Sequence, residues 1–197
     1  TMPELGTLHD AFIDELRDAY DAEKQLVKAL PTLARSARAP KLRAAIEGHL
    51  AETRDHVTRL EEVFASLDEK PSARHCDGIA GIIKEGASVM AHDFADDATS
   101  DACLIASGQR AEHYEIAAYG TLVAWARAMG HDEAASILDS ILAQEKAADD
   151  ALTDLAESGI NQEAADIAHP DGDAEEPAAP RRAATTSDLR TRKARQR

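Results

Sequence analysis

Residues 8–33 read LHDAFIDELRDAYDAEKQLVKALPTL, and their apolar positions recur at steps of three and four residues. This spacing is typical of one face of a long α-helix. Glu23 falls in the middle of that face. An isolated ionised carboxylate is costly to bury in a protein core. The stretch therefore predicts a packed helix whose buried acid requires a compensating partner, and a bound cation is the simplest one.

Three further stretches repeat this pattern of an apolar face interrupted by acids. Four long helices are therefore expected, at about residues 7–38, 41–67, 97–129 and 132–158. Short turns join the first two and the last two, so each pair forms an antiparallel hairpin. Residues 68–96 are long enough to cross the length of the bundle and carry a short helix at about 78–92. The sequence predicts an all-α, ferritin-like four-helix bundle with one long crossover.

Composition and charge restrict the class of protein further. Aromatic residues make up 4% of the chain and alanine is abundant, which favours close-packed helices over strands. The net charge is −15, so the body should attract cations and repel nucleic acid. No apolar run is long enough to span a membrane, and the first residues do not resemble a signal peptide. Two cysteines without metal-type spacing favour a reducing, cytoplasmic location.

The C-terminal part differs from the rest. We expect the bundle to occupy residues 1–163 and a disordered tail to occupy residues 164–197, because proline and acidic residues break the helical pattern there. Seven basic residues and one acid follow in residues 177–197. The basic run offers a weak case for contact with nucleic acid, and a solvated tail without a partner is the alternative.

The interior acids of the first hairpin are expected to meet. Counting outward from the turn places Glu23 level with His56, and Glu52 lies one helical turn away from His56. Glu52 and His56 share a helix face because they are four residues apart. His49 faces the same way and is a further candidate ligand, with a packed core histidine as the alternative.

The second hairpin repeats the arrangement. Glu115 is level with Glu145, and Glu112 is level with a position beside Asp149. Glu112 and Glu115 lie on one face, so either one or both could be ligands. The sequence thus predicts one acidic cluster from each hairpin.

Carboxylates with one or two imidazoles are a ligand set that suits iron or manganese. Two divalent cations would neutralise four of the carboxylates, and two adjacent metal ions can bind dioxygen or peroxide between them. Tyr20 and Tyr119 could donate phenolic hydrogen bonds to ligand carboxylates, and they are the candidate proton or electron donors of a catalytic reaction. The alternative is that the acids are hydrated and hold no metal.

Several segments carry a resemblance to a known family. They are Leu8–Phe12, Asp18–Leu26, His49–Thr53, Glu112–Leu122 and Glu145–Asp149. Over about residues 5–160 the chain resembles the YciF-type bacterial stress proteins. The resemblance implies a ferritin-like bundle, a homodimer, a di-metal (di-iron or di-manganese) site and a role in the stress response. It suggests oxidoreductase chemistry that removes peroxide or dioxygen.

The chain departs from the Glu-x-x-His pattern of ferritins, because residue 55 is Asp and residue 148 is Ala. Three functions therefore stay open at this stage. They are redox turnover at a di-metal centre, metal binding or sequestration without turnover, and a metal-free structural role under stress.

Overall fold

The structure is a computed structural model that describes residues 6–169. Within this range the chain forms helices and no strand. The helices are α1 (Leu8–Ser36), α2 (Pro40–Ser66), α3 (Asp77–Met90), α4 (Asp97–Ala128), α5 (Asp132–Leu155), the π-helical turn η1 (Ala156–Ile160) and α6 (Asn161–Ala168).

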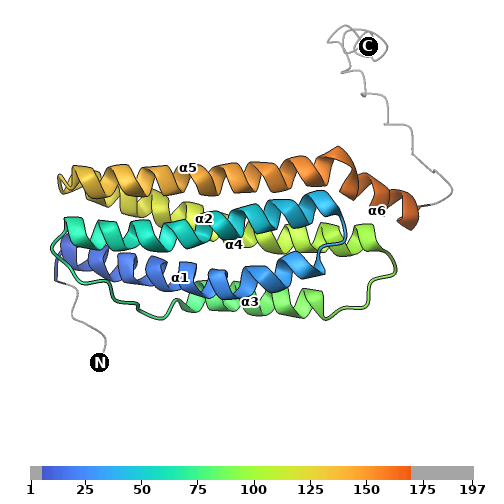
Figure 1. Cartoon of the computed structure of the whole chain (residues 1–197), viewed down its shortest axis with the longest axis horizontal. Coiled ribbons are helices and arrows are strands. Elements are labelled where there is room, and N and C mark those ends of the chain that lie inside the picture. Colours follow the sequence, from blue (N-terminus) through green and yellow to red (C-terminus); the bar gives the residue numbers. More distant parts are fainter. Residues whose placement is uncertain (1–5, 170–197) are drawn as a thin grey trace, which may run out of the picture.

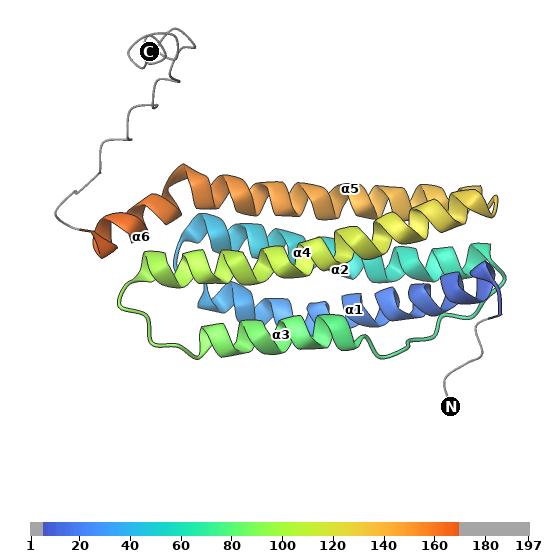
Figure 2. The ribbon, with the colours of Figure 1, turned by 180° about the vertical axis from the view of Figure 1, so that it is seen from behind.

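The four long helices run side by side as two antiparallel hairpins, α1 with α2 and α4 with α5 (Figure 1). The α2–α3 segment returns along the bundle, so that α3 lies against α1 and α4 (Figure 2). The structure thus confirms the predicted all-α bundle of two hairpins joined by a crossover that contains a short helix. The expected bounds of the first three long helices differ from the observed ones by at most two residues.

Local signals in the sequence fix the ends of these helices. The Thr7 side chain accepts a hydrogen bond from the Asp10 backbone, and the Asp10 carboxylate accepts one from the Thr7 backbone, which closes a capping box at the start of α1. Pro40 occupies the first turn of α2, where its missing N–H is not needed. Gly130 has φ +74°, a left-handed conformation that ends α4 at little cost.

Ion pairs and hydrogen bonds attach the crossover to α1. An Nη of Arg74 lies 2.9 Å from Asp18 Oδ1, and the Cys76 backbone N–H donates to Asp21 Oδ2 at 2.9 Å. Gly78, at the start of α3, faces the ring of Tyr114 on α4, and a Cβ at this position would lie 2.5 Å from that ring. The absence of a side chain at Gly78 therefore lets α3 approach α4 closely.

The hydrophobic core divides into two parts along the bundle axis. One part, which we call the aromatic half, contains Phe12, Leu16, Tyr20, Leu60, Phe64, Tyr119, Leu122, Leu138 and Ile141. The other part, the alanine half, contains Ala22, Leu26, Leu30, Ala34, Leu42, Ile46, Leu104, Ala111, Leu152 and Ala156. The buried acids lie where these two halves meet.

The last helical segment extends further than the sequence indicated. Helix α5 was expected to end near residue 158 and the bundle at 163, but α6 continues to Ala168 after a break in helical geometry at Gly159. No residue of α6 is buried. Residues 164–168 of the predicted disordered tail are therefore helical, and the rest of that tail from residue 170, with its basic run, lies outside the described residues. Between residues 6 and 169, no helix is both long and apolar enough to cross a membrane.

Candidate metal centre

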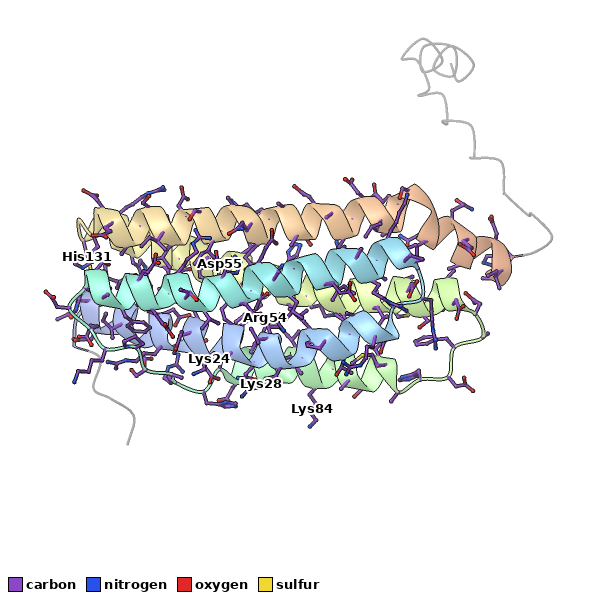
Figure 3. The ribbon with its side chains drawn as sticks, in the orientation of Figure 1. Lys24, Lys28, Arg54, Asp55, Lys84 and His131 are labelled. Atoms are coloured by element: carbon purple, nitrogen blue, oxygen red, sulfur yellow. The ribbon has the colours of Figure 1, made fainter. Side chains whose placement is uncertain are left out.

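Six histidine and glutamate side chains are buried at the junction of the two halves. They are Glu23 from α1, His49 and His56 from α2, Glu112 and Glu115 from α4, and Glu145 from α5. Charged side chains on the outer faces of the helices do not turn inward in this way. Lys84, for example, points away from the bundle (Figure 3). The four long helices thus turn only some of their acids inward, at one level of the bundle.

The first group of candidate ligands contains four of these residues. One ligand atom each from His49, Glu112, Glu115 and Glu145 lies within 4.8 Å of all the others. His49 Nε2 is 3.4 Å from Glu112 Oε1 and 3.8 Å from Glu145 Oε2. One imidazole and three carboxylates therefore converge on a volume that could hold one cation.

The second group contains Glu23, His56 and Glu145, with ligand atoms that also lie within 4.8 Å of one another. His56 Nδ1 is 3.3 Å from Glu23 Oε1 and 3.0 Å from Glu145 Oε1. Glu145 belongs to both groups and turns a different oxygen to each. A carboxylate placed in this way is suited to lie between two cations.

Many ligand atoms of this centre have no hydrogen-bond partner. Both oxygens of Glu115 and of Glu145 are unpartnered, and so is one oxygen of Glu23 and one of Glu112. Buried polar atoms normally have partners, so each exception requires an explanation. Divalent cations that prefer oxygen and imidazole ligands would supply it, and the residues present fit such ions.

Neighbouring side chains orient two of the candidate ligands. Gln144 Oε1 accepts a hydrogen bond of 2.6 Å from Arg59 Nη1 and lies 3.2 Å from His56 Nε2. Because Gln144 Oε1 is an acceptor, His56 Nε2 must carry the proton, and in the neutral ring Nδ1 keeps its lone pair for a metal. The Tyr119 hydroxyl donates to Glu23 Oε1. A hydrogen bond from Tyr119 to a ligand carboxylate was expected from the sequence, but its partner is Glu23 on α1 and not Glu115 on its own helix.

The electrostatics reflect the crowding of negative charge in a buried place. Burial raises the pKa of Glu23, and it raises the pKa of Glu112 and Glu115 well above the usual range, with the charge of Glu145 adding to the effect. Burial and the nearby charge of Glu23 raise the pKa of Tyr119 as well. Without a cation these groups favour their protonated forms.

His56 and Glu145 behave as an ion pair within this cluster. Burial alone would lower the pKa of His56, but the carboxylates of Glu145 and Glu23 outweigh it and raise the pKa to about 10. Burial acts to raise the pKa of Glu145, whereas His56 and His49 lower it, and the net shift is downward. A protonated His56 therefore offsets part of the negative charge when no metal is bound.

Three residues predicted for the site lie outside both groups. The Glu52 side chain is 44% exposed, and its Oε2 lies 3.7 Å from His49 Nδ1, on the side of the ring away from the centre. Asp149 is partly buried: its Oδ2 lies 3.1 Å from Nε2 of the exposed His113, and its Oδ1 is buried without a hydrogen-bond partner. The Tyr20 hydroxyl donates to Glu61 Oε1 at 2.7 Å. The predicted contact between Tyr20 and a ligand is absent from the described residues.

Both members of each pair of alternatives from the sequence analysis lie in the candidate groups. Glu112 and Glu115 both belong to the first group, and His49 and His56 belong to different groups. Sequence reasoning did not identify Arg59 and Gln144. Arg59 lies three residues after His56 and Gln144 directly precedes Glu145, so helical spacing could have placed Arg59 beside the centre.

Comparison with known proteins agrees with this geometry. The family described as "Domain of unknown function (DUF892)" matches residues 7–165. The protein YciF of Escherichia coli is 41% identical over 161 residues, which cover 81% of this chain and 96% of YciF.

Three solved structures have the same fold. The crystal structure of the E. coli stress protein YciF matches with a TM-score of 0.76, over 80% of this chain and 99% of that one. YcfI of Rhodopseudomonas palustris is 41% identical with a TM-score of 0.74, over 78% of this chain and 97% of its own. A Xanthomonas campestris protein is 22% identical with a TM-score of 0.61, over 83% and 98% of the two chains, and supports the fold alone.

Proposed function

This chain belongs to the DUF892 family of YciF-like stress proteins, and we propose that it holds two divalent ions, iron or manganese, and removes oxidants such as peroxide. In the proposed centre, His49, Glu112 and Glu115 hold one ion and Glu23 and His56 hold the other. Glu145 contributes one oxygen to each ion.

The observation that carries the proposal is the position of Glu145. Its side chain is fully buried, and its two oxygens face two different histidines without a hydrogen-bond partner. A hydrophobic core tolerates such a carboxylate only when a charge or donors compensate it. Two cations would compensate Glu145 and the surrounding carboxylates together.

The residues around the centre have separate tasks in this proposal. Two adjacent redox-active ions would bind peroxide or dioxygen and exchange electrons with it. Gln144 and Arg59 hold the His56 ring so that Nδ1 faces the ion. Tyr119 holds its proton at Glu23 Oε1 and is the candidate proton or electron donor. Tyr20, whose hydroxyl is bound to Glu61, has no such task.

A second candidate function is a structural stress protein in which protons replace the metals. The raised pKa values of His56, Glu112 and Glu115 favour this reading, because a protonated histidine and neutral carboxyl groups reduce the charge of the cluster without any ion. A third candidate, metal sequestration without turnover, shares the metal centre with the first and differs only in chemistry.

Metal analysis tests the centre directly. We expect about two equivalents of iron or manganese per chain in protein produced in medium supplemented with either metal, and fewer than one in Glu145→Gln. Glu62→Gln is the matched control, because Glu62 is an exposed acid on α2. Metal-free protein from both media, or equal metal content in Glu145→Gln and Glu62→Gln, would overturn the proposal in favour of the structural role.

Turnover separates detoxification from sequestration. The metal-loaded chain should consume hydrogen peroxide repeatedly, either by converting two peroxide molecules to two water molecules and one dioxygen or, with an added reductant, by reducing peroxide to water. Tyr119→Phe should slow this reaction while metal content stays near two. A loaded protein that reacts once and stops supports sequestration. The cytoplasmic location and the homodimer that the resemblance implies belong to the same proposal, and light scattering of the purified chain tests the dimer.

A further inference from the structure

A cavity of about 490 Å³ lies in the alanine half and ends at the candidate metal centre. Helices α1 to α5 all contribute to its walls, which consist mainly of leucine, isoleucine, alanine and glycine. His49 and Glu112 lie at its inner end, and Glu52 lies beside them. The cavity therefore joins an apolar space to the group of ligands around His49.

The cavity reaches the surface through small side chains. Six of the lining residues are exposed. They are Ala44 and Gly48 on α2, Ala147 and Ala151 on α5, Thr32 on α1 and Ala87 on α3. A Cβ built on Gly48 would have no neighbouring atom within 4 Å. These positions leave room for a molecule to enter between the helices.

The size and shape of the space limit what can fill it. An engineered apolar cavity of about 150 Å³ binds benzene, and small-molecule sites are roughly 300–1,000 Å³. On α4 the lining extends from Leu104 to Glu112, which is about 12 Å at 1.5 Å per residue. That length is roughly the length of an extended decanoyl chain. Because the walls come from five helices, the cavity offers no single open face for a partner helix.

We propose that this cavity binds the alkyl chain of a single-chain amphiphile such as a medium-chain fatty acid, with its oxygen-bearing head group beside His49 and Glu112. The placement of the head group rests on the proposed metal centre, because the carboxylate of Glu52 would repel an anionic head in the absence of cations. The binding of the chain itself depends only on the apolar walls.

Two probes separate these parts. The full chain, metal-free and manganese-loaded, is titrated calorimetrically with 1-decanol and with decanoate. We expect 1-decanol to bind both forms with similar affinity. Decanoate should bind the manganese-loaded form at least about tenfold more tightly than the metal-free form. Decanoate affinity that is the same in both forms would overturn the placement of the head group.

Variants that fill the cavity test its location. Gly48→Leu adds a side chain from α2 and Ala148→Leu adds one from α5, and each should weaken 1-decanol binding at least about tenfold. Gly81→Leu is the matched control, because Gly81 is an exposed helical glycine outside the lining, with nothing within 4 Å of its Cβ. It should bind 1-decanol as the unaltered chain does.

The possible failures can be told apart. A chain that binds no metal but still binds 1-decanol, and loses it in Gly48→Leu, overturns the proposed function and keeps the cavity. A chain that binds two metal ions but no 1-decanol overturns the cavity and keeps the metal centre. Loss of a dimer in Gly48→Leu, without decanol binding to the unaltered chain, would assign the opening to self-association and overturn the inference.

Discussion

The two halves of the bundle share the same four long helices but differ in how they are filled. In the aromatic half, Phe12, Phe64 and Tyr119 are almost completely buried and pack with leucine and isoleucine. In the alanine half, small side chains leave a cavity of about 490 Å³. The packed side chains of the aromatic half therefore hold the helices together. The alanine half keeps an unfilled space, although protein interiors normally contain few voids of this size.

The difference teaches that the centre stands at a boundary between a rigid support and an accessible space. Glu23 is held by Tyr119 of the aromatic half, whereas His49 and Glu112 line the cavity. Candidate ligands can thus be positioned from one side while the other side stays open to small molecules. Four experiments would break or sharpen this comparison.

We expect the largest effect from pH, which acts on the boundary itself. The raised pKa of His56, about 10, contributes stability that is fully present below its ordinary value of 6.5 and is lost as the pH rises toward 10. The raised pKa values of Glu112 and Glu115 act in the same direction, because the folded state holds their protons above pH 4.5.

The free energy of unfolding of the metal-free chain should therefore fall between pH 6 and pH 10. Manganese competes with these protons, so the stabilisation that it provides should grow over the same interval. Urea denaturation at several pH values, with and without manganese, measures both trends. A metal-free stability that rises with pH would contradict the assignment.

Removing a leucine from each half tests the packing directly. Leu60→Ala in the aromatic half should lower the free energy of unfolding by about 2–5 kcal/mol, because Leu60 is fully buried. Leu30→Ala should cost at least about 1 kcal/mol less, because one side of Leu30 faces the cavity and has no packing contacts there to lose. Chemical denaturation of the metal-free variants is the measurement. Equal losses would mean that the two halves are packed alike.

A substitution of Glu115 separates two contributions to stability: the destabilisation caused by the buried carboxylate and the stabilisation provided by bound metal. Excess manganese should stabilise the unaltered chain by about 2.7 kcal/mol for each bound ion at a hundredfold excess over the dissociation constant of that ion. Glu115→Gln should remove most of the gain from the ion held by the His49 group and raise metal-free stability by on the order of 1 kcal/mol, because burial disfavours the ionised carboxylate of Glu115, as its raised pKa indicates, and the amide carries no charge. Thermal unfolding with and without manganese checks the result. A variant that keeps the full gain would exclude Glu115 as a ligand.

We expect the smallest effects from alanine substitutions at two helical glycines. One glycine lies where two helices pack closely, and the other lies at the opening of the cavity. Gly78→Ala should cost about 1–3 kcal/mol, because its Cβ would collide with Tyr114. Gly48→Ala should instead stabilise the fold by about 0.5–1 kcal/mol, since its Cβ meets open space and alanine favours the helix. Denaturation midpoints compare the pair. Destabilisation by Gly48→Ala would show that the opening is narrower than the structure indicates.

Much of the fold could be predicted because its signals are local. The period of the apolar positions set the four helices, and Thr7, Pro40 and Gly130 set several of their ends. Counting outward from the turns placed Glu23 level with His56 and Glu115 level with Glu145, but it predicted one cluster for each hairpin and did not bring Glu145 to Glu23 and His56. Both steps require only regular helices and short connections.

The rest depends on side-chain choices and distances between helices, which no spacing encodes. Asp149 shares a face with Glu145, but His113 offers it a partner at the surface. Tyr20 lies one turn before Glu23, but Glu61 captures its hydroxyl. The abundance of alanine predicted close-packed helices. In the alanine half, however, several alanines line a cavity. The consequence of a small side chain depends on whether the backbones close around it.

The shared position of Glu145 has a thermodynamic consequence for the proposed centre. Glu145 turns one oxygen to each group of candidate ligands. If one of its oxygens binds an ion, the position of the other oxygen is fixed as well. Occupancy of either group would require Glu145 to take a fixed orientation, so the residues of the other group would already be arranged. Occupancy would then pass from none to two over a narrow range of free metal, with a sigmoidal binding curve.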